Sequence, residues 1–149
     1  MKVKVKVPAT SANLGPGFDV AGLALTLYNT FTFELADQGL NITGCPEQFC
    51  NEENMTYQAF KQAAEICGLE YQGVNIECSG DVPYTRGLGS SSTCIVAGIV
   101  GAFAFKDKVE DRQEILELAT AIEGHPDNVA PAIFGGLTVS VMEEDNVLT

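Results

Sequence analysis

Basic residues are scarce in this chain of 149 residues, and the formal net charge is −12 with only two arginines, Arg86 and Arg112. Proteins that bind DNA or RNA through the phosphate backbone gather lysine and arginine on one surface. The composition therefore disfavours nucleic acid as a partner. It also indicates that an anionic ligand would be held mainly by groups other than lysine.

Paired cysteine motifs are missing as well. The five cysteines, at positions 45, 50, 67, 78 and 94, are odd in number and include no Cys-x-x-Cys pair. This pattern argues against both a disulfide framework and a zinc cluster. We expect reduced thiols, some of them buried, in a cytoplasmic protein.

The sequence has no long hydrophobic run and no opening segment of the kind that directs export. The apolar run near residues 94–105 is interrupted by glycine and is too short to span a bilayer. The length, with 46% hydrophobic residues, is typical of one soluble globular domain. The final segment EEDNVLT closes no element, which suggests half of a longer protein.

Hydrophobic spacing predicts strands and helices in a mixed order. Alternating residues predict a strand over 2–7 that stops at Pro8, one long or two short strands over 23–35, and short strands near 40–44, 74–78 and 137–141. Helical spacing and capping residues predict helices over 54–67, 94–105, 111–123 and 128–134. The lack of regular β-α alternation favours an α+β fold over a doubly wound sheet.

One stretch, VPYTRGLGSSST at residues 82–93, stands directly before the longest apolar helix. The unpaired backbone N–H groups at the start of that helix would point back at the loop, and glycines 87 and 89 would leave room for an anion to approach them. Hydroxyls from Ser90 to Thr93 could donate to phosphate oxygens or bind Mg²⁺. A phosphate site without lysine is therefore possible here.

Other interpretations of this loop differ in strength. A Walker loop needs a lysine, and none lies between Lys61 and Lys106, while a nucleophile elbow needs a second glycine after the serine. A simple helix-capping turn stays open, because short glycine motifs are weak signals on their own. The proline before the loop and the buried helix after it favour the phosphate site.

Three separated stretches carry a resemblance to a known family: PATSANLGPGFDVAGLAL at 8–25, PYTRGLGSSST at 83–93 and EGHPDNVAPAIFGGL at 123–137. Together they resemble the homoserine kinase branch of the GHMP kinases, a family of small-molecule kinases. The first and third stretches are specific to that branch, and the second is shared by the whole family. Members of the branch are about twice this length, so the chain is similar to their N-terminal, ATP-binding half.

The resemblance implies a mixed sheet backed by helices, related to domain 2 of a small-subunit ribosomal protein. It also implies transfer of the γ-phosphoryl group of ATP to the side-chain hydroxyl of L-homoserine, a step toward threonine, with Mg²⁺ as cofactor. A homodimer is possible. No nucleic acid or membrane partner is expected.

The resemblance also assigns roles to residues. The ATP phosphate loop would be Pro83, Tyr84, Thr85, Arg86, Gly87, Leu88, Gly89, Ser90, Ser91, Ser92 and Thr93, with a serine at 92 where most members have alanine. Ser91 and Glu117 would hold the metal, although on residue type alone Glu117 is a solvent-facing helix carboxylate. Asn13, Asp19 and Asn128 would line the amino-acid substrate, whereas taken alone Asn13 and Asp19 are turn formers.

Asn128 matches the position at which mevalonate kinases carry an aspartate thought to act as a base. Because an amide cannot take a proton at neutral pH, catalysis at Asn128 would depend on positioning and charge stabilisation. The single histidine, His125, is more often structural in this motif than chemical, and Asp127 is favoured as a helix cap over a metal ligand.

Two other functions stay open from the sequence. The chain could be a nucleotide-binding module without activity of its own, or a GHMP kinase for another small alcohol. An aspartate at position 128 would have favoured the second, and the observed Asn128 counts against it.

Overall fold

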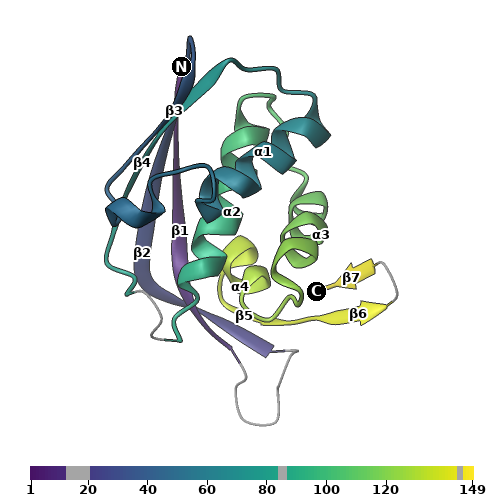
Figure 1. The fold of residues 1–149 in the computed structure, drawn as a ribbon. Coiled ribbons are helices and arrows are strands. Elements are labelled where there is room, and N and C mark those ends of the chain that lie inside the picture. Colours follow the sequence, from purple (N-terminus) through teal and green to yellow (C-terminus); the bar gives the residue numbers. More distant parts are fainter. Residues whose placement is uncertain (13–20, 84–86, 144–145) are drawn as a thin grey trace.

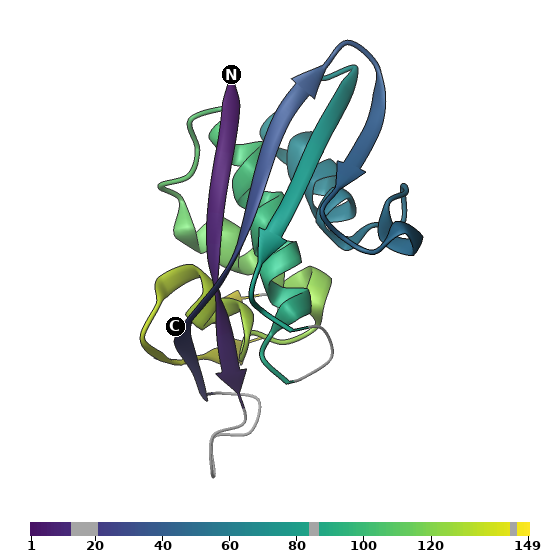
Figure 2. The same cartoon turned by 90° about the vertical axis from the view of Figure 1, so that its left-hand side faces the viewer.

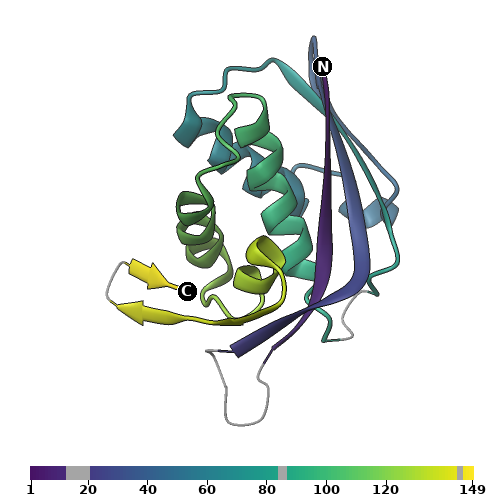
Figure 3. The same ribbon diagram turned by 180° about the vertical axis from the view of Figure 1, so that it is seen from behind.

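The computed structural model describes residues 1–12, 21–83, 87–143 and 146–149. These residues form two layers, a mixed β-sheet on one side and helices α1 to α4 on the other (Figure 1). In Figure 2 the strands lie in front of the helices, and Figure 3 shows the same two layers from behind. The expectation of an α+β fold with a sheet backed by helices is confirmed.

The sheet contains five strands among the described residues, β1 (Lys2–Ala12), β2 (Ala21–Ala36), β3 (Gly39–Thr43), β4 (Gly73–Gly80) and β5 (Leu137–Val139). Their order is β1-β2-β4-β3, and β5 pairs with the first residues of β2. β3 and β4 are parallel, and the other pairs are antiparallel. The segment predicted as one long or two short strands is thus the single strand β2.

The predicted stop at Pro8 is wrong, because β1 continues through the proline to Ala12. Proline is compatible with an edge strand or a bulge, where its missing N–H removes no ladder bond. β1 is an edge strand, and its register against β2 shifts between Pro8 and Thr10. The continuation places Thr10 beside the loop that precedes α2, where its N–H donates to the carbonyl of Leu88 at 3.0 Å.

The helices begin and end close to their predicted limits. They are α1 (Met55–Cys67), α2 (Ser90–Ala104), α3 (Arg112–Glu123) and α4 (Val129–Phe134), with a short 3₁₀ helix η1 at Glu47–Phe49. The cap of α3 is as expected, since Asp111 accepts a hydrogen bond from the N–H of Glu114 at 3.0 Å. The predicted strand over 137–141 is instead divided at Ser140 into β5 and β6 (Val141–Glu143), and β6 pairs with β7 (Asn146–Leu148).

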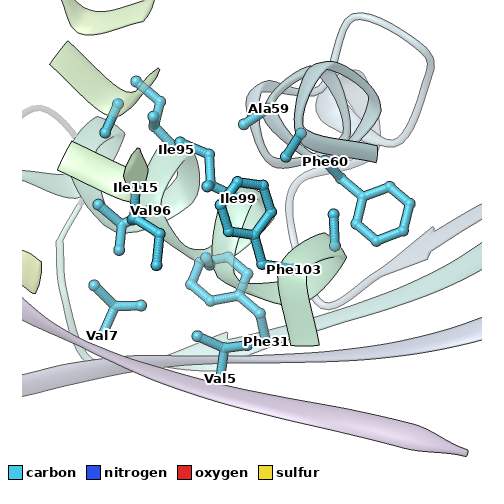
Figure 4. Close-up of a cluster of buried hydrophobic side chains, with 14 of the residues drawn as sticks. Val5, Val7, Phe31, Ala59, Phe60, Ile95, Val96, Ile99, Phe103 and Ile115 are labelled. Atoms are coloured by element: carbon cyan, nitrogen blue, oxygen red, sulfur yellow. The ribbon is translucent and has the colours of Figure 1, made fainter. Parts of the chain in front are cut away.

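α2 is the centre of the core and packs against both the sheet and α1 (Figure 4). Two glycines permit this close packing. A Cβ atom on Gly101 would lie 2.7 Å from the ring of Phe33 on β2, and one on Gly98 would lie 2.3 Å from the carbonyl oxygen of Thr56 on α1. The expectation of a buried helix packed closely on a sheet is confirmed, and α1 is the second surface that it contacts.

Burial in β1 follows the alternation in its sequence. Val3, Val5 and Val7 are buried beneath the helices, and the lysines between them are exposed.

Within the described residues, no helix is long and apolar enough to cross a membrane. All five cysteines are free thiols.

Candidate active site at the N-terminus of α2

Helix α2 begins at Ser90, inside the serine cluster, and its N-cap is Gly89. Gly87 and Gly89 both have positive φ, 71° and 68°, a conformation that glycine adopts without strain. The first bond of the helix runs from the N–H of Thr93 to the carbonyl of Gly89 at 3.0 Å. Helix geometry therefore leaves the N–H groups that precede Thr93 without acceptors inside α2, available to an anion.

The loop before α2 is held at both ends by one side chain of β2. Asn29 donates from Nδ2 to Thr93 Oγ1 at 3.0 Å and accepts from the N–H of Val82 at 3.3 Å. Thr93 in turn donates its hydroxyl to the carbonyl of Ser90 at 2.7 Å. Asn29 thus connects Val82, two residues after the end of β4, to Thr93 in the first turn of α2.

Asn128 lies directly beside this helix start. The hydroxyl of Thr10 donates to Asn128 Oδ1 at 2.7 Å. The backbone of Gly89 passes so close to this pair that a Cβ atom there would lie 2.1 Å from Thr10 Oγ1 and 3.3 Å from Asn128 Oδ1. The strand β1, the loop before α2 and the start of α4 therefore meet at one point.

A second polar contact joins the helix start to the end of α3. The hydroxyl of Ser91 donates to Glu123 Oε1 at 3.3 Å, and His125 Nδ1 contacts Asp127 Oδ1 close by. Burial raises the pKa of the Glu123 carboxyl above its ordinary value. The hydrogen bond from Ser91 and the nearby His125 lower this pKa in part, and the neighbouring Asp127 raises it. Asp127 is buried and accepts the N–H of Asn128 at 2.9 Å. The N-cap of α4 is Asn128, and no side-chain bond caps the helix, so the expectation that Asp127 caps α4 is wrong.

A cavity of about 750 Å³ opens in front of the helix start. Of the residues assigned to a site from the sequence, Gly87, Gly89, Ser90, Ser91 and Asn128 line it. The volume lies within the range typical of pockets for small-molecule ligands.

Another part of the cavity wall comes from residues between the end of β3 and the first turn of α1, which the sequence analysis did not assign to any site. Phe49 and Met55 line this wall and are 46% and 45% exposed. Two large apolar residues within the polar stretch CPEQFCNEENM are the signal that could have revealed it. This part of the wall therefore combines two large apolar side chains with the polar residues Glu53, Asn54 and Thr56.

Several predicted residues lie apart from the cavity or are occupied otherwise. Glu117 is exposed on α3, and its carboxylate accepts a hydrogen bond from Gln113 at 3.0 Å. The carboxylate that contacts Ser91 belongs to Glu123 instead. Ser92 and Thr93 have fully buried side chains. Pro83 and Leu88 are half-buried. Asn13, Asp19, Tyr84, Thr85 and Arg86 lie outside the described residues.

Comparison with known proteins identifies the group to which this arrangement belongs. Residues 54–136 match the family described as GHMP kinases N terminal domain. The chain belongs to the GHMP kinase family. This match includes α1, α2, α3 and α4, and with them the loop at Gly89 and the side chain of Asn128.

The resemblance to homoserine kinases is confirmed by individual relatives. The chain is 53% identical to a homoserine kinase of Clostridium beijerinckii over 144 residues, and these residues are 96% of the chain and 48% of the relative. A homoserine kinase of Clostridium botulinum is 50% identical over 147 residues, 98% of the chain and 49% of the relative. The chain thus spans about half the length of the curated relatives that it matches.

Solved structures agree with the fold described above. The crystal structure of a homoserine kinase from Cytophaga hutchinsonii superposes with a TM-score of 0.81 at 31% identity, over 99% of this chain and 51% of that one. A mevalonate kinase from Methanococcus jannaschii shares the fold with a TM-score of 0.75 at 16% identity. The GHMP kinase N-terminal fold expected from the sequence is confirmed.

Proposed function

We propose that this chain is the nucleotide-binding part of a homoserine kinase, which transfers the γ-phosphoryl group of ATP to the side-chain hydroxyl of L-homoserine. The observation that supports this most strongly is the 53% identity to a homoserine kinase over nearly the whole chain. The placement of Asn128 at the helix start is consistent with it, because Asn128 is the residue that the resemblance assigned to the substrate and to catalysis. The product would be O-phospho-L-homoserine.

In this proposal the triphosphate binds at the start of α2. The free N–H groups of the first turn and the dipole of the helix favour an anion there, which compensates for the scarcity of lysine. Glycine at 87 and at 89 keeps the backbone accessible, and the side chains of Ser90 and Ser91 line the same cavity. The apolar wall at Phe49 and Met55 suits the base of the nucleotide.

The oxygen atoms near Ser91 fit a magnesium ion that accompanies the nucleotide. Mg²⁺ prefers oxygen ligands and is commonly held by one or two protein groups together with phosphate oxygens and water. Among the described residues no group of three or more acidic, cysteine or histidine side chains could hold a metal. We therefore propose Ser91, with Glu123 as the nearby carboxylate, while Glu117 remains the prediction from the resemblance. The ion would neutralise negative charge on the phosphates.

Asn128 would orient the hydroxyl of homoserine for in-line attack. Thr10 occupies Oδ1 of Asn128, which leaves Nδ2 as the donor group of that side chain. An amide takes no proton, so the rate enhancement would come from positioning and from charge stabilisation by the helix start. We propose that Asn13 and Asp19 complete the substrate site, as the resemblance implies.

The remaining assignments follow from the same resemblance. We propose a cytoplasmic enzyme that acts in threonine biosynthesis, in keeping with the free thiols. We also propose that activity requires sequence corresponding to the other half of the relatives. The homodimer stays a prediction.

The test is a chimera in which this chain replaces the matching 48% of the Clostridium beijerinckii homoserine kinase. We expect ADP formation that depends on L-homoserine and is absent with mevalonate or galactose. Asn128→Ala in the chimera should abolish turnover while nucleotide binding persists. Nucleotide binding without homoserine-dependent turnover in a folded chimera would instead support a binding module, and turnover of another alcohol would support a different GHMP kinase.

A further inference from the structure

Cysteine thiols gather at one wall of the cavity. Cys45, Cys78 and Cys94 line it, on the segment after β3, on β4 and on α2 respectively. Cys50 lies beside Cys45, with their Sγ atoms 3.3 Å apart. Cys67, in contrast, is buried at the end of α1. Four of the five thiols therefore lie at the cavity or directly beside it.

The pair of Cys45 and Cys50 is brought together by its own backbone. The connecting residues form the 3₁₀ helix η1, closed by bonds from the N–H of Phe49 to the carbonyl of Pro46 at 2.9 Å and from the N–H of Cys50 to that of Glu47 at 3.0 Å. The two sulfur atoms need to approach by only about 1.3 Å to reach the length of an S–S bond, about 2.0 Å. A disulfide here would join the two ends of a turn that is already formed.

The surroundings favour this pair over other chemistry of the cluster. Residues 46–49 are exposed, and Cys50 is half-buried, so a dissolved oxidant can reach it. Cys45 and Cys78 are harder to ionise, since burial and neighbouring thiols raise the pKa of Cys45 to about 11 and that of Cys78 to about 12. No group of three or more possible metal ligands is found among the described residues, which disfavours a thiolate metal site.

We propose that Cys45 and Cys50 are a redox modification site that forms a reversible disulfide in the wall of the nucleotide pocket. With a small disulfide such as oxidised glutathione as oxidant, the Cys50 thiolate attacks one sulfur and releases one thiol. Cys45 then attacks the mixed disulfide at the sulfur of Cys50 and releases the second thiol. The protein loses two electrons and two protons, and the oxidant becomes two thiols.

This modification would act on the pocket through the turn that it closes. Cys45 and Phe49 line the same cavity as Ser90, and the turn that joins them is the one the disulfide would lock. A nucleotide in the pocket would cover Cys45 and restrict the approach of the two sulfurs. We therefore expect bound MgADP to slow the oxidation at least threefold, a link that depends on the proposed function, whereas the disulfide itself does not.

Trypsin separates the possible disulfides. Cleavage after lysine and arginine places Cys45 and Cys50 together in peptide 7–61, Cys67 and Cys78 in peptide 62–86, and Cys94 in peptide 87–106. The chain is equilibrated with mixtures of reduced and oxidised glutathione, alkylated, digested and analysed by mass spectrometry. We expect peptide 7–61 to carry no alkyl group and to weigh two hydrogen atoms less than the unalkylated dithiol peptide, and alkylated thiols to fall from five to three. Reduction should restore five.

Variants define what would overturn the proposal. Cys50→Ser should abolish the change in peptide 7–61, and Cys67→Ala should leave it intact. A cross-link between peptides 7–61 and 62–86, or a chain that keeps five alkylated thiols in every glutathione mixture, would contradict the assigned pair. If calorimetry shows MgADP binding but the oxidation rate is unchanged, the disulfide stands and its link to the pocket is wrong. Absence of MgADP binding would contradict the proposed function alone.

Discussion

The hydroxyl of Thr10 donates to Oδ1 of Asn128 at 2.7 Å, although the two residues are 118 positions apart in the sequence. This bond joins the end of β1 to the start of α4 directly beside the N-cap of α2. It holds Oδ1 of the Asn128 amide toward Thr10 and so sets the direction in which the donor Nδ2 points. Asn128 is therefore oriented by Thr10, to which the sequence analysis assigned no role.

Replacing this donor should reduce catalysis more than nucleotide binding. Thr10→Val keeps the shape of the side chain but leaves Asn128 without its partner, a change of about 0.5–1.5 kcal/mol for a typical hydrogen bond. We expect kcat of the chimeric kinase to fall about threefold to tenfold, with the affinity for MgADP nearly unchanged. Thr10→Ser retains the hydroxyl and should retain most of the rate. An equal loss in both variants would show that the hydroxyl is not what matters.

The two glycines of the loop before α2, Gly87 and Gly89, should respond differently to alanine. Both have positive φ, which costs a residue with Cβ about 1–2 kcal/mol. Gly87→Ala meets nothing within 4 Å, whereas Gly89→Ala would overlap Thr10 Oγ1 at 2.1 Å. Overpacking of this kind adds about 1–3 kcal/mol. Urea unfolding should therefore show a clearly larger loss of stability for Gly89→Ala, and equal losses would contradict the close approach.

The contribution of Glu123 to stability should depend on pH and should be largest in acid, when the protein is compared with the variant Glu123→Gln. Its pKa is raised in the folded state, mainly by burial, so the folded protein binds this proton more tightly than the unfolded chain does. The stabilising effect is present below the ordinary pKa of 4.5 and is lost as the pH rises through the raised value. Glu123→Gln keeps an oxygen for Ser91 and removes the charge.

The comparison needs unfolding curves of both proteins at several pH values. We expect the Gln variant to gain stability relative to the natural protein as the pH rises from about 4 to 7, where a carboxyl with an unperturbed pKa would give no gain. The exposed Glu117→Gln serves as the matched control on the same helix. A difference between Glu123→Gln and the natural protein that does not change with pH would contradict the raised pKa.

The elements of this fold were largely predictable because their signals are local. The alternation in β1, the Asp111 cap and the apolar run of α2 each specify an element from a few neighbouring residues. Pro8 misled the prediction because its effect depends on whether the strand is at an edge or at a bulge, and both are set by the pairing with β2. Division of the last strand at Ser140 likewise depends on which partner each part pairs with.

The site was predictable where one segment carries it and not where several meet. The loop from Gly87 to Ser91 has a composition that specifies its own shape, so the helix start was found from the sequence. The contacts Thr10–Asn128 and Ser91–Glu123 each join segments more than 30 residues apart, and neither pair has a local signal. The resemblance led to Glu117 for the metal, while the structure places Glu123 against Ser91.

Asn29 should be as important to the loop as the glycines within it. Its amide bonds Val82 on one side of the loop and Thr93 on the other, so Asn29→Ala removes both bonds and leaves the buried hydroxyl of Thr93 with one partner fewer. Each bond contributes about 0.5–1.5 kcal/mol, and we expect a loss of about 1–3 kcal/mol in urea unfolding. Calorimetry should show MgADP affinity about tenfold lower, because the N–H groups at the helix start would be less well ordered. Asn41→Ala, at an exposed position on β3, is the matched control and should change neither quantity. A folded Asn29→Ala variant with unchanged affinity would show that the glycines and the helix itself are sufficient to order the loop.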